Sequence, residues 1–300
     1  MNLNKIAMIK KMILGVVALV FFAMSCSNDD DTTTVTPPQE STSPLTINNF
    51  TGLEALGNDY VYEGWIIVDG DPISTGTFSS VTFPQTFQVN TSDLEDATAF
   101  VLSIEPAVDT DPLPADTKVL AGNFSGNMAE LTTGVVGDFT ASSGTFFLRT
   151  PTDETGTNNG NDEYGVWFGA PGMPPTANFT LPTLPAGWVY EGWVVGEAGP
   201  ITTGIFTDFS AADGASTFSG ASAGPPVPGE DFFNNAPAGE IFPLDVRGRT
   251  VVISVEPYPD NSPAPFAIKP LVGTAGTATA PATNDFGLNL DSLPTGMVSR

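Results

Sequence analysis

The segment Tyr62–Ile67 reads YEGWII, and it returns 128 residues later as Tyr190–Val195, YEGWVV. The segment Pro72–Phe78 (PISTGTF) returns at the same offset as Pro200–Phe206 (PITTGIF). An offset shared by two separate motifs is typical of an internal duplication. The sequence therefore predicts two similar modules that follow one another in the chain.

A later pair of motifs shows where the two copies differ in length. The segment Ser103–Pro106 (SIEP) matches Ser254–Pro257 (SVEP) at an offset of 151 residues, and later LAG and LVG motifs share this offset. The second copy therefore contains 23 additional residues before its SVEP motif. We expect them in the stretch 219–235, because it is rich in glycine and proline.

Both copies have the pattern of short β-strands separated by turns. Runs rich in β-branched and aromatic residues occur at Tyr60–Val68, Ala99–Ile104, Thr145–Leu148 and Arg249–Val255. The chain contains 31 glycines and 27 prolines, which leaves little room for long helices. The predicted fold is all-β, with two tandem immunoglobulin-like antiparallel β-sandwich modules over residues 47–182 and 183–300.

Cys26 is the only cysteine of the chain, and it follows the features of a lipoprotein signal peptide. Lysines precede an apolar run over residues 12–24, and small residues stand close before the cysteine. The apolar run is shorter than the ~20 residues that a membrane-spanning helix needs. We therefore expect residues 1–25 to be removed and Cys26 to become the acylated N-terminus. An ordinary secretory signal or an N-terminal membrane helix is the alternative.

Residues 26–46 form an acidic and Thr/Pro-rich segment, which we interpret as a disordered tether. Its start, Ser27–Asp31 (SNDDD), resembles the signal by which some Gram-negative lineages export lipoproteins to the cell surface. Serine at the second mature position also favours the outer membrane. We expect an outer-membrane lipoprotein exposed on the cell surface, with an inward-facing periplasmic position as the alternative.

The charge balance and the rare residue types exclude several functions. The chain carries 34 acidic and 9 basic residues, with a formal net charge of −25. A field of that sign repels nucleic acid and anionic lipid. The absence of histidine removes the residue most used for proton transfer at neutral pH, and Cys26 leaves no free thiol as nucleophile or metal ligand. The sequence thus predicts a protein that is not an enzyme and uses no cofactor.

The order of the motifs YEGW, PISTGTF, IEP and LAG resembles the extracytoplasmic C-terminal domain of anti-sigma-K factors. The resemblance covers about Tyr60–Gly122 and about Trp188–Gly273, and it implies an exported sensor or interaction domain. Typical members of that family place the domain after a transmembrane helix and a cytoplasmic sigma-binding domain. We expect neither of these here, and therefore no sequestration of a sigma factor.

Two glutamates and two lysines occupy matching places in the two copies. Lys118 follows Glu105 by 13 residues, and Lys269 follows Glu256 by 13 residues. We expect each pair to form a salt bridge between neighbouring strands or loops, and loss of one partner would leave a charge unpaired. The alternative is a catalytic pair in which a partly buried lysine acts as base or nucleophile.

The YEGW motifs also have two interpretations. Strand alternation puts the tyrosine on one face and the glutamate and tryptophan on the other. We expect the tryptophans to anchor the core, and a carbohydrate platform of tryptophan and glutamate is the alternative. Trp167 and Trp188 are candidates for the contact between the modules. The motif residues concerned are Tyr62, Glu63, Trp65, Tyr190, Glu191 and Trp193.

Acidic turns raise the hypothesis of calcium binding. Calcium needs about six to eight converging oxygens, and the segment 153–163 contains enough carboxylates and amides to supply them. Its spacing differs from that of an EF-hand loop, and the second copy has no evident counterpart. We therefore expect solvated acidic loops and no metal site, there and at Asp69, Asp71, Asp109 and Asp111.

These features together predict a membrane-anchored, exported lipoprotein whose two modules have a binding or structural role at the cell envelope. Its partners would be the membrane, through the N-terminal lipid, and an unidentified protein or envelope ligand. One alternative is an accessory component of envelope signalling through an anti-sigma-type regulator. Another is a surface protein that binds or degrades glycans, which paired carboxylates in a tryptophan-lined cleft would support.

Overall fold

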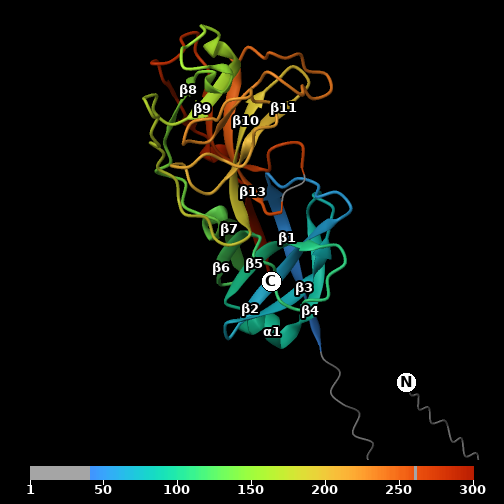
Figure 1. Cartoon of the computed structure of the whole chain (residues 1–300). Coiled ribbons are helices and arrows are strands. Elements are labelled where there is room, and N and C mark those ends of the chain that lie inside the picture. Colours follow the sequence, from blue (N-terminus) through green and yellow to red (C-terminus); the bar gives the residue numbers. More distant parts are fainter. Residues whose placement is uncertain (1–40, 260–261) are drawn as a thin grey trace, which may run out of the picture. The chain divides into compact units, whose positions relative to one another are not determined.

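The computed structural model describes residues 41–259 and 262–300 (Figure 1). The expected signal peptide, the acylated Cys26 and most of the expected tether lie outside the described residues. We expect the tether to extend to residue 46, but strand β1 (Thr42–Thr51) begins at Thr42. Leu45 and Ile47 are both buried, and this alternation along β1 makes the segment a strand and not a tether.

One antiparallel sheet of eight strands contains most of the N-terminal half of the chain. Its edge strands β3 and β4 also contact each other, so the sheet is nearly closed into a barrel. We call this sheet, with helix α1 (Thr91–Asp96) between β4 and β5, the first module. In spatial order its strands are β3 (Asp71–Phe78), β2 (Tyr60–Val68), β5 (Ala99–Pro106), β6 (Lys118–Ser125), β7 (Met128–Thr132), β17 (Thr295–Ser299), β1 and β4 (Gln85–Asn90).

Two smaller antiparallel sheets form what we call the second module. The aromatic rings of β9 and β11 meet between them, at Phe168 and Phe206. The five-stranded sheet has the order β11 (Pro200–Phe206), β10 (Trp188–Val195), β13 (Thr250–Pro257), β14 (Ile268–Thr274) and β16 (Gly287–Leu288). The four-stranded sheet has the order β12 (Gly229–Asp231), β9 (Gly165–Phe168), β8 (Thr145–Leu148) and β15 (Asn284–Asp285).

The expectation of an antiparallel all-β fold is confirmed, but immunoglobulin-like sandwiches are not. The first module has a single sheet, because β17 and β1 continue it from β7 to β4. A sandwich would instead divide these strands between two sheets. The remaining helices are short 3₁₀ turns: η1 (Thr133–Val135), η2 (Pro151–Asp153), η3 (Asp162–Tyr164) and η4 (Leu290–Ser292). No helix in the described part of the chain is long and apolar enough to cross a membrane.

The last strand of the sequence belongs to the first module. Strand β17 lies between β7 and β1 and pairs with both, and Figure 1 marks the C-terminus among the strands of this module. Strand β8 follows β7 in the sequence but pairs with β9 and β15 of the second module. Strand pairing therefore crosses the expected boundary between residues 182 and 183 in both directions. The division into 47–182 and 183–300 stays a prediction.

The glycine of each YEGW motif is required by close packing at a β-bulge. The register between β2 and β3 shifts after Gly64, and the register between β10 and β11 shifts after Gly192. A side chain at Gly64 would collide with Thr75 and Phe100, and a side chain at Gly192 would collide with Thr203, the counterpart of Thr75, and with Phe168 of β9. The two strand pairs therefore bend in the same way, which brings the motif residues of both modules into equivalent surroundings.

Candidate functional site

The tyrosine of each YEGW motif fixes the loop that precedes its strand. The Tyr62 hydroxyl donates to the Glu54 carbonyl at 2.9 Å, and the Tyr190 hydroxyl donates to the Pro182 carbonyl at 2.6 Å. Both rings are buried, and burial raises the pKa of both hydroxyls. The phenols thus stay neutral at physiological pH, and they act as structural donors.

The tryptophan of the first motif is linked to a buried glutamate through a serine. Trp65 Nε1 donates to Ser103 Oγ at 2.8 Å, and that hydroxyl donates to Glu105 Oε1. The backbone N–H of Ala115 also donates to Glu105 Oε1, at 2.9 Å. Burial raises the pKa of Glu105, although these hydrogen bonds oppose the shift.

The second module repeats this network with its own residues. Trp193 Nε1 donates to Ser254 Oγ at 2.8 Å, and the Ser254 hydroxyl donates to Glu256 Oε1. The backbone N–H of Phe266 donates to Glu256 at 3.0 Å. The serine was not among the expected functional residues, although the spacing Ser-x-Glu recurs in both copies and is a signal that identifies it.

The glutamates of the YEGW motifs, Glu63 and Glu191, each bind a hydroxyl of the neighbouring strand. Glu63 accepts from the Ser74 hydroxyl, and Glu191 accepts from the Thr202 hydroxyl.

The tryptophans of the chain do not form a platform for sugars. Each of the four is at most 3% exposed, so no indole face is open to a ligand: Trp65, Trp167, Trp188 and Trp193.

The expected ion pair between Glu105 and Lys118 does not occur within 4.0 Å in the described structure. Both side chains instead contact Ala115, since Lys118 Nζ donates to its carbonyl at 3.0 Å and Glu105 accepts from its N–H. Burial lowers the pKa of Lys269, and the charges of Glu54 and Glu256 oppose that shift. Lys269 therefore interacts electrostatically with Glu256.

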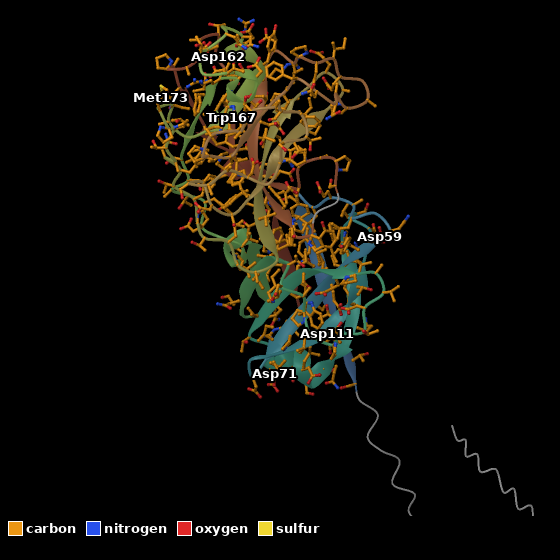
Figure 2. The ribbon with its side chains drawn as sticks, viewed as in Figure 1. Asp59, Asp71, Asp111, Asp162, Trp167 and Met173 are labelled. Atoms are coloured by element: carbon orange, nitrogen blue, oxygen red, sulfur yellow. The ribbon has the colours of Figure 1, made fainter. Side chains whose placement is uncertain are left out.

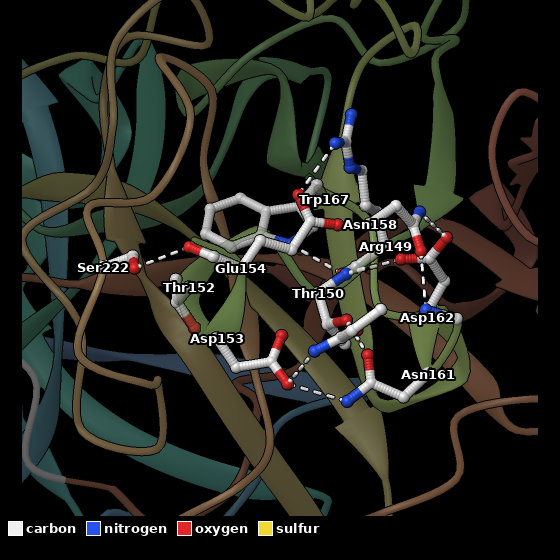
Figure 3. Close-up of polar contacts among 12 residues, drawn as sticks. Arg149, Thr150, Thr152, Asp153, Glu154, Asn158, Asn161, Asp162, Trp167 and Ser222 are labelled. Atoms are coloured by element: carbon white, nitrogen blue, oxygen red, sulfur yellow. Dashed lines mark hydrogen bonds and ion pairs between the residues drawn. The ribbon is translucent and has the colours of Figure 1, made fainter. Parts of the chain in front are cut away.

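The acidic and amide-rich segment 153–163 is tied together by its own hydrogen bonds (Figure 3). Asp153 accepts from the side-chain amides of Asn159 at 2.9 Å and Asn161 at 2.7 Å. Asp162 accepts from the Asn158 amide at 2.7 Å. In the described residues, no group of three histidine, cysteine or acidic side chains is arranged to hold a metal ion.

The other acidic turns do not come together either. Figure 2 shows Asp71 and Asp111, from two of these turns, at separate places on the first module.

A set of buried carboxylates in the second module was not predicted from the sequence. Asp231 is fully buried in β12, and it accepts from Trp167 Nε1 at 2.9 Å and from the Thr152 N–H at 2.8 Å. Burial raises the pKa of Asp231 to about 7, and burial also raises the pKa of Asp213 to about 7. These groups lie in the stretch that is longer in the second copy, so the repeated motifs give no sign of them.

The raised pKa values predict that the protein becomes less stable as the pH rises from 5 to 8. The ordinary pKa of an aspartate is 3.8, so the folded chain binds more protons than the unfolded chain between about pH 4 and 7. Stability from these groups is therefore complete below about pH 4 and is lost as the pH passes 7. With no histidine in the chain, no side chain with an ordinary pKa near 6.5 masks this slope.

Thermal unfolding at pH 5, 6, 7 and 8 measures this effect. The melting temperature should fall across the series. Asp231→Asn should reduce the dependence of the unfolding free energy on pH by the contribution of about one proton, about 1.4 kcal/mol per pH unit. Asp208→Asn is the matched control, because Asp208 is exposed and its pKa is lowered by hydrogen bonds from Ser210. A melting temperature that stays constant or rises from pH 5 to 8 would contradict the prediction.

A cavity of about 570 Å³ lies where loops of the two modules meet. The first module contributes residues 54–60, from the β1–β2 loop and the first residue of β2, together with the end of β5 and the end of the β5–β6 loop. The second module contributes residues 256–259, together with Ser262, Pro263 and Phe266. Most of the lining is apolar, and it includes Leu56, Tyr60, Ile104, Pro106, Tyr258 and Phe266.

Equivalent backbone hydrogen bonds hold the loops around the cavity. The Ala107 N–H donates to the Asp59 carbonyl at 2.8 Å, and the Tyr258 N–H donates to the Gly187 carbonyl at 2.8 Å. Gly187 has a φ of +83°, and a side chain there would approach Asp116 to 3.1 Å. The β9–β10 loop of the second module thus packs closely on the β5–β6 loop of the first.

Three acidic side chains line the cavity. Glu54 and Asp59 line it from the first module, and Glu256 lines it from the second. Glu256 is fully buried, whereas Asp59 is exposed directly before the first residue of β2 (Figure 2). No lysine or arginine is part of the lining.

A known family model matches a segment that includes much of the first module. Residues 16–118 match the family model described as "Anti-sigma-K factor rskA, C-terminal". The match covers about a third of the chain and includes the YEGW motif of β2 and Glu105 of β5. No curated protein and no solved structure matches the chain.

The match confirms the expected resemblance to anti-sigma-K C-terminal domains for residues 16–118 only. The corresponding resemblance over Trp188–Gly273 stays a prediction. The second module has the same order of four strands, β11, β10, β13 and β14, as the order β3, β2, β5 and β6 in the first. The first module therefore connects the chain to the family, and the second module shares motifs and strand order with the first.

Proposed function

We propose that this protein is a membrane-anchored, exported lipoprotein whose two β modules bind a protein partner or ligand at the cell envelope without catalysing a reaction. The observation that carries the proposal is the apolar cavity between the loops of the two modules. Its volume is within the ~300–1,000 Å³ of ligand sites, which often lie at the junction of two domains. The match to a regulator domain over residues 16–118 supports a binding role.

The hydrogen bonding of Glu105 and Glu256 supports a role without catalysis. Glu105 accepts from Ser103 and from the Ala115 N–H, and Glu256 accepts from Ser254 and from the Phe266 N–H. These contacts hold each carboxylate against its own β-strand or loop. The proposed duplication provides two copies of this scaffold, and the binding site forms between them.

Envelope signalling is the second candidate, and the family match favours it. In that role the modules would bind a ligand or protein outside the cytoplasm and affect a separate anti-sigma-type regulator. Binding or degradation of glycans has less support, because the four tryptophans are buried and none of them lines the cavity.

Chemical crosslinking of intact cells, with a surface-protease control on the same preparation, tests the proposal. The expected result is protease sensitivity of the protein together with one dominant crosslinked protein. Protection from protease together with capture of a membrane-embedded regulator would support the signalling role on the periplasmic side. A Cys26→Ser variant should lose membrane attachment if Cys26 is acylated. Recovery of the unmodified chain with no crosslinked protein would contradict a binding role.

A further inference from the structure

We propose that the cavity between the modules binds a cationic, proline-rich peptide segment of another protein. The inference rests on the proposed function and adds the chemical class of the ligand. Three observations support it: the acidic side chains of the lining, the aromatic and proline side chains there, and the fact that the described chain's own lysines and arginines already interact within the chain.

The charge of the cavity favours a cation. Glu54, Asp59 and Glu256 line it, and Lys269 is the cation whose charge acts on two of these carboxylates. The side chain of Asp59 accepts no hydrogen bond from any described residue and is exposed, so it is open to a ligand. A lysine or arginine at this rim would form a charge-assisted hydrogen bond with it.

The walls of the cavity fit an extended apolar peptide. Tyr258 is 56% exposed at the cavity, the half-buried Tyr60 adds ring surface, and the buried Phe266 forms part of the wall. Pro106 and Pro257 continue this surface along the ends of β5 and β13. Grooves lined by aromatic side chains recognise segments in the polyproline II conformation, whose ordering on binding costs little entropy. An arginine of the segment would also gain a cation–π contact with an exposed tyrosine ring.

A second copy of the described chain is a poor source of this cation. Arg149, Arg247 and Arg249 pair with acidic side chains, and the Arg300 guanidinium donates to backbone carbonyls. Lys118 donates to Ala115, and Lys269 lies in the field of its own acidic neighbours. Each lysine and arginine of residues 41–259 and 262–300 is therefore engaged within its own chain. The ligand must then come from a different, more basic protein.

Titration calorimetry of the protein, purified from membranes of cells that express the full chain, tests the proposal. The probes are two six-residue peptides of alternating proline and leucine, one with a central arginine and one with glutamate in its place. The arginine peptide should bind at least ~10-fold more tightly, and the difference should shrink in 0.5 M salt because salt screens the attraction.

Variants assign the binding to the cavity. Glu54→Gln with Asp59→Asn should remove most of the preference for arginine, and Tyr258→Ala should weaken both peptides without lowering the melting temperature. Asp109→Asn with Asp111→Asn is the matched control, since these exposed residues lie outside the cavity lining. Equal affinity for the two peptides, no binding of either, or an equal effect of the control pair would overturn the proposal.

The experiment also separates this inference from the proposed function. If cells yield a crosslinked partner while neither peptide binds, the proposed ligand class is wrong and the binding role stands. If cells yield no partner and neither peptide binds, both proposals fail.

Discussion

Deletion of Thr295–Arg300 is expected to unfold the first module, although these residues are the last of the sequence. Strand β17 forms five residue pairs with β1 and five with β7, so its loss separates the two halves of the eight-stranded sheet. Val298, fully buried in the core, is lost as well. Each lost hydrogen bond costs about 1 kcal/mol, and the total approaches the ~5–15 kcal/mol of a whole domain.

Hydrogen exchange measured by mass spectrometry checks this prediction. Amides of β1 and β7 should lose protection in the deleted protein, while those of β10 and β13 keep more of theirs. Point substitutions in β17 and at Arg300 should destabilise the first module less than the deletion does. Val298→Ala should cost about 1–3 kcal/mol through its cavity. Arg300→Met should remove the guanidinium donors to the carbonyls of Leu94, Ala97 and Gly126.

Thr295→Ser is the control for these variants, because the residue is exposed and serine keeps the hydroxyl that contacts Thr51. It should leave exchange in β1 unchanged. Retention of full protection in β1 after the deletion would show that β17 is not needed to hold this sheet together.

Replacement of Trp193 by alanine is expected to destabilise the protein by about 3–5 kcal/mol. The indole is 2% exposed, and its Nε1 donates to Ser254. Trp193→Phe should cost less, because it keeps most of the packing and loses the hydrogen bond. Ser254→Ala should cost about 1–3 kcal/mol, because it leaves the indole N–H without an acceptor and removes one donor to the buried Glu256.

The same substitutions in the first module provide a matched comparison. Trp65→Phe and Ser103→Ala remove the equivalent contacts, and we expect their free energies of unfolding to change by amounts similar to those of the second module. Denaturant unfolding of all the variants gives these values. A difference of more than about 2 kcal/mol between equivalent variants would show that the two networks are not energetically equivalent.

The sequence was sufficient to predict the strands that carry the repeated motifs. The buried tryptophans and the antiparallel pairing follow from patterns of a few residues, whereas the bulge at Gly64 and Gly192 was not predicted. Local alternation of buried and exposed positions determines such features. The motif spacing also predicted that Glu105 and Glu256 would have matching environments.

The sequence was not sufficient to predict which strands complete each sheet. Pairing of β17 with β1 joins residues about 250 positions apart, and short strands such as β8 and β15 have no pattern that selects a partner. The expected Glu105–Lys118 pair was wrong as a direct contact, because both side chains bind the backbone of Ala115 instead. Spacing along the chain gives equivalence between copies, but the path of the β5–β6 loop decides which atoms meet.

The cavity and the buried Asp231 also depend on folding of the whole chain. The cavity forms from loops that are far apart in sequence, and each loop alone has only the composition of a turn. Asp231 lies in an ordinary acidic stretch, and only its burial against Trp167 and Thr152 changes its chemistry.

The most direct test of the central claim, that the cavity between the modules is a binding site, is photocrosslinking in intact cells. A photoreactive amino acid replaces Tyr258 at the cavity in one strain and Ile241, which is 84% exposed and outside the lining, in another. We predict a discrete crosslinked protein from position 258 that is absent from position 241. No product from position 258, or the same products from both positions, would contradict the claim.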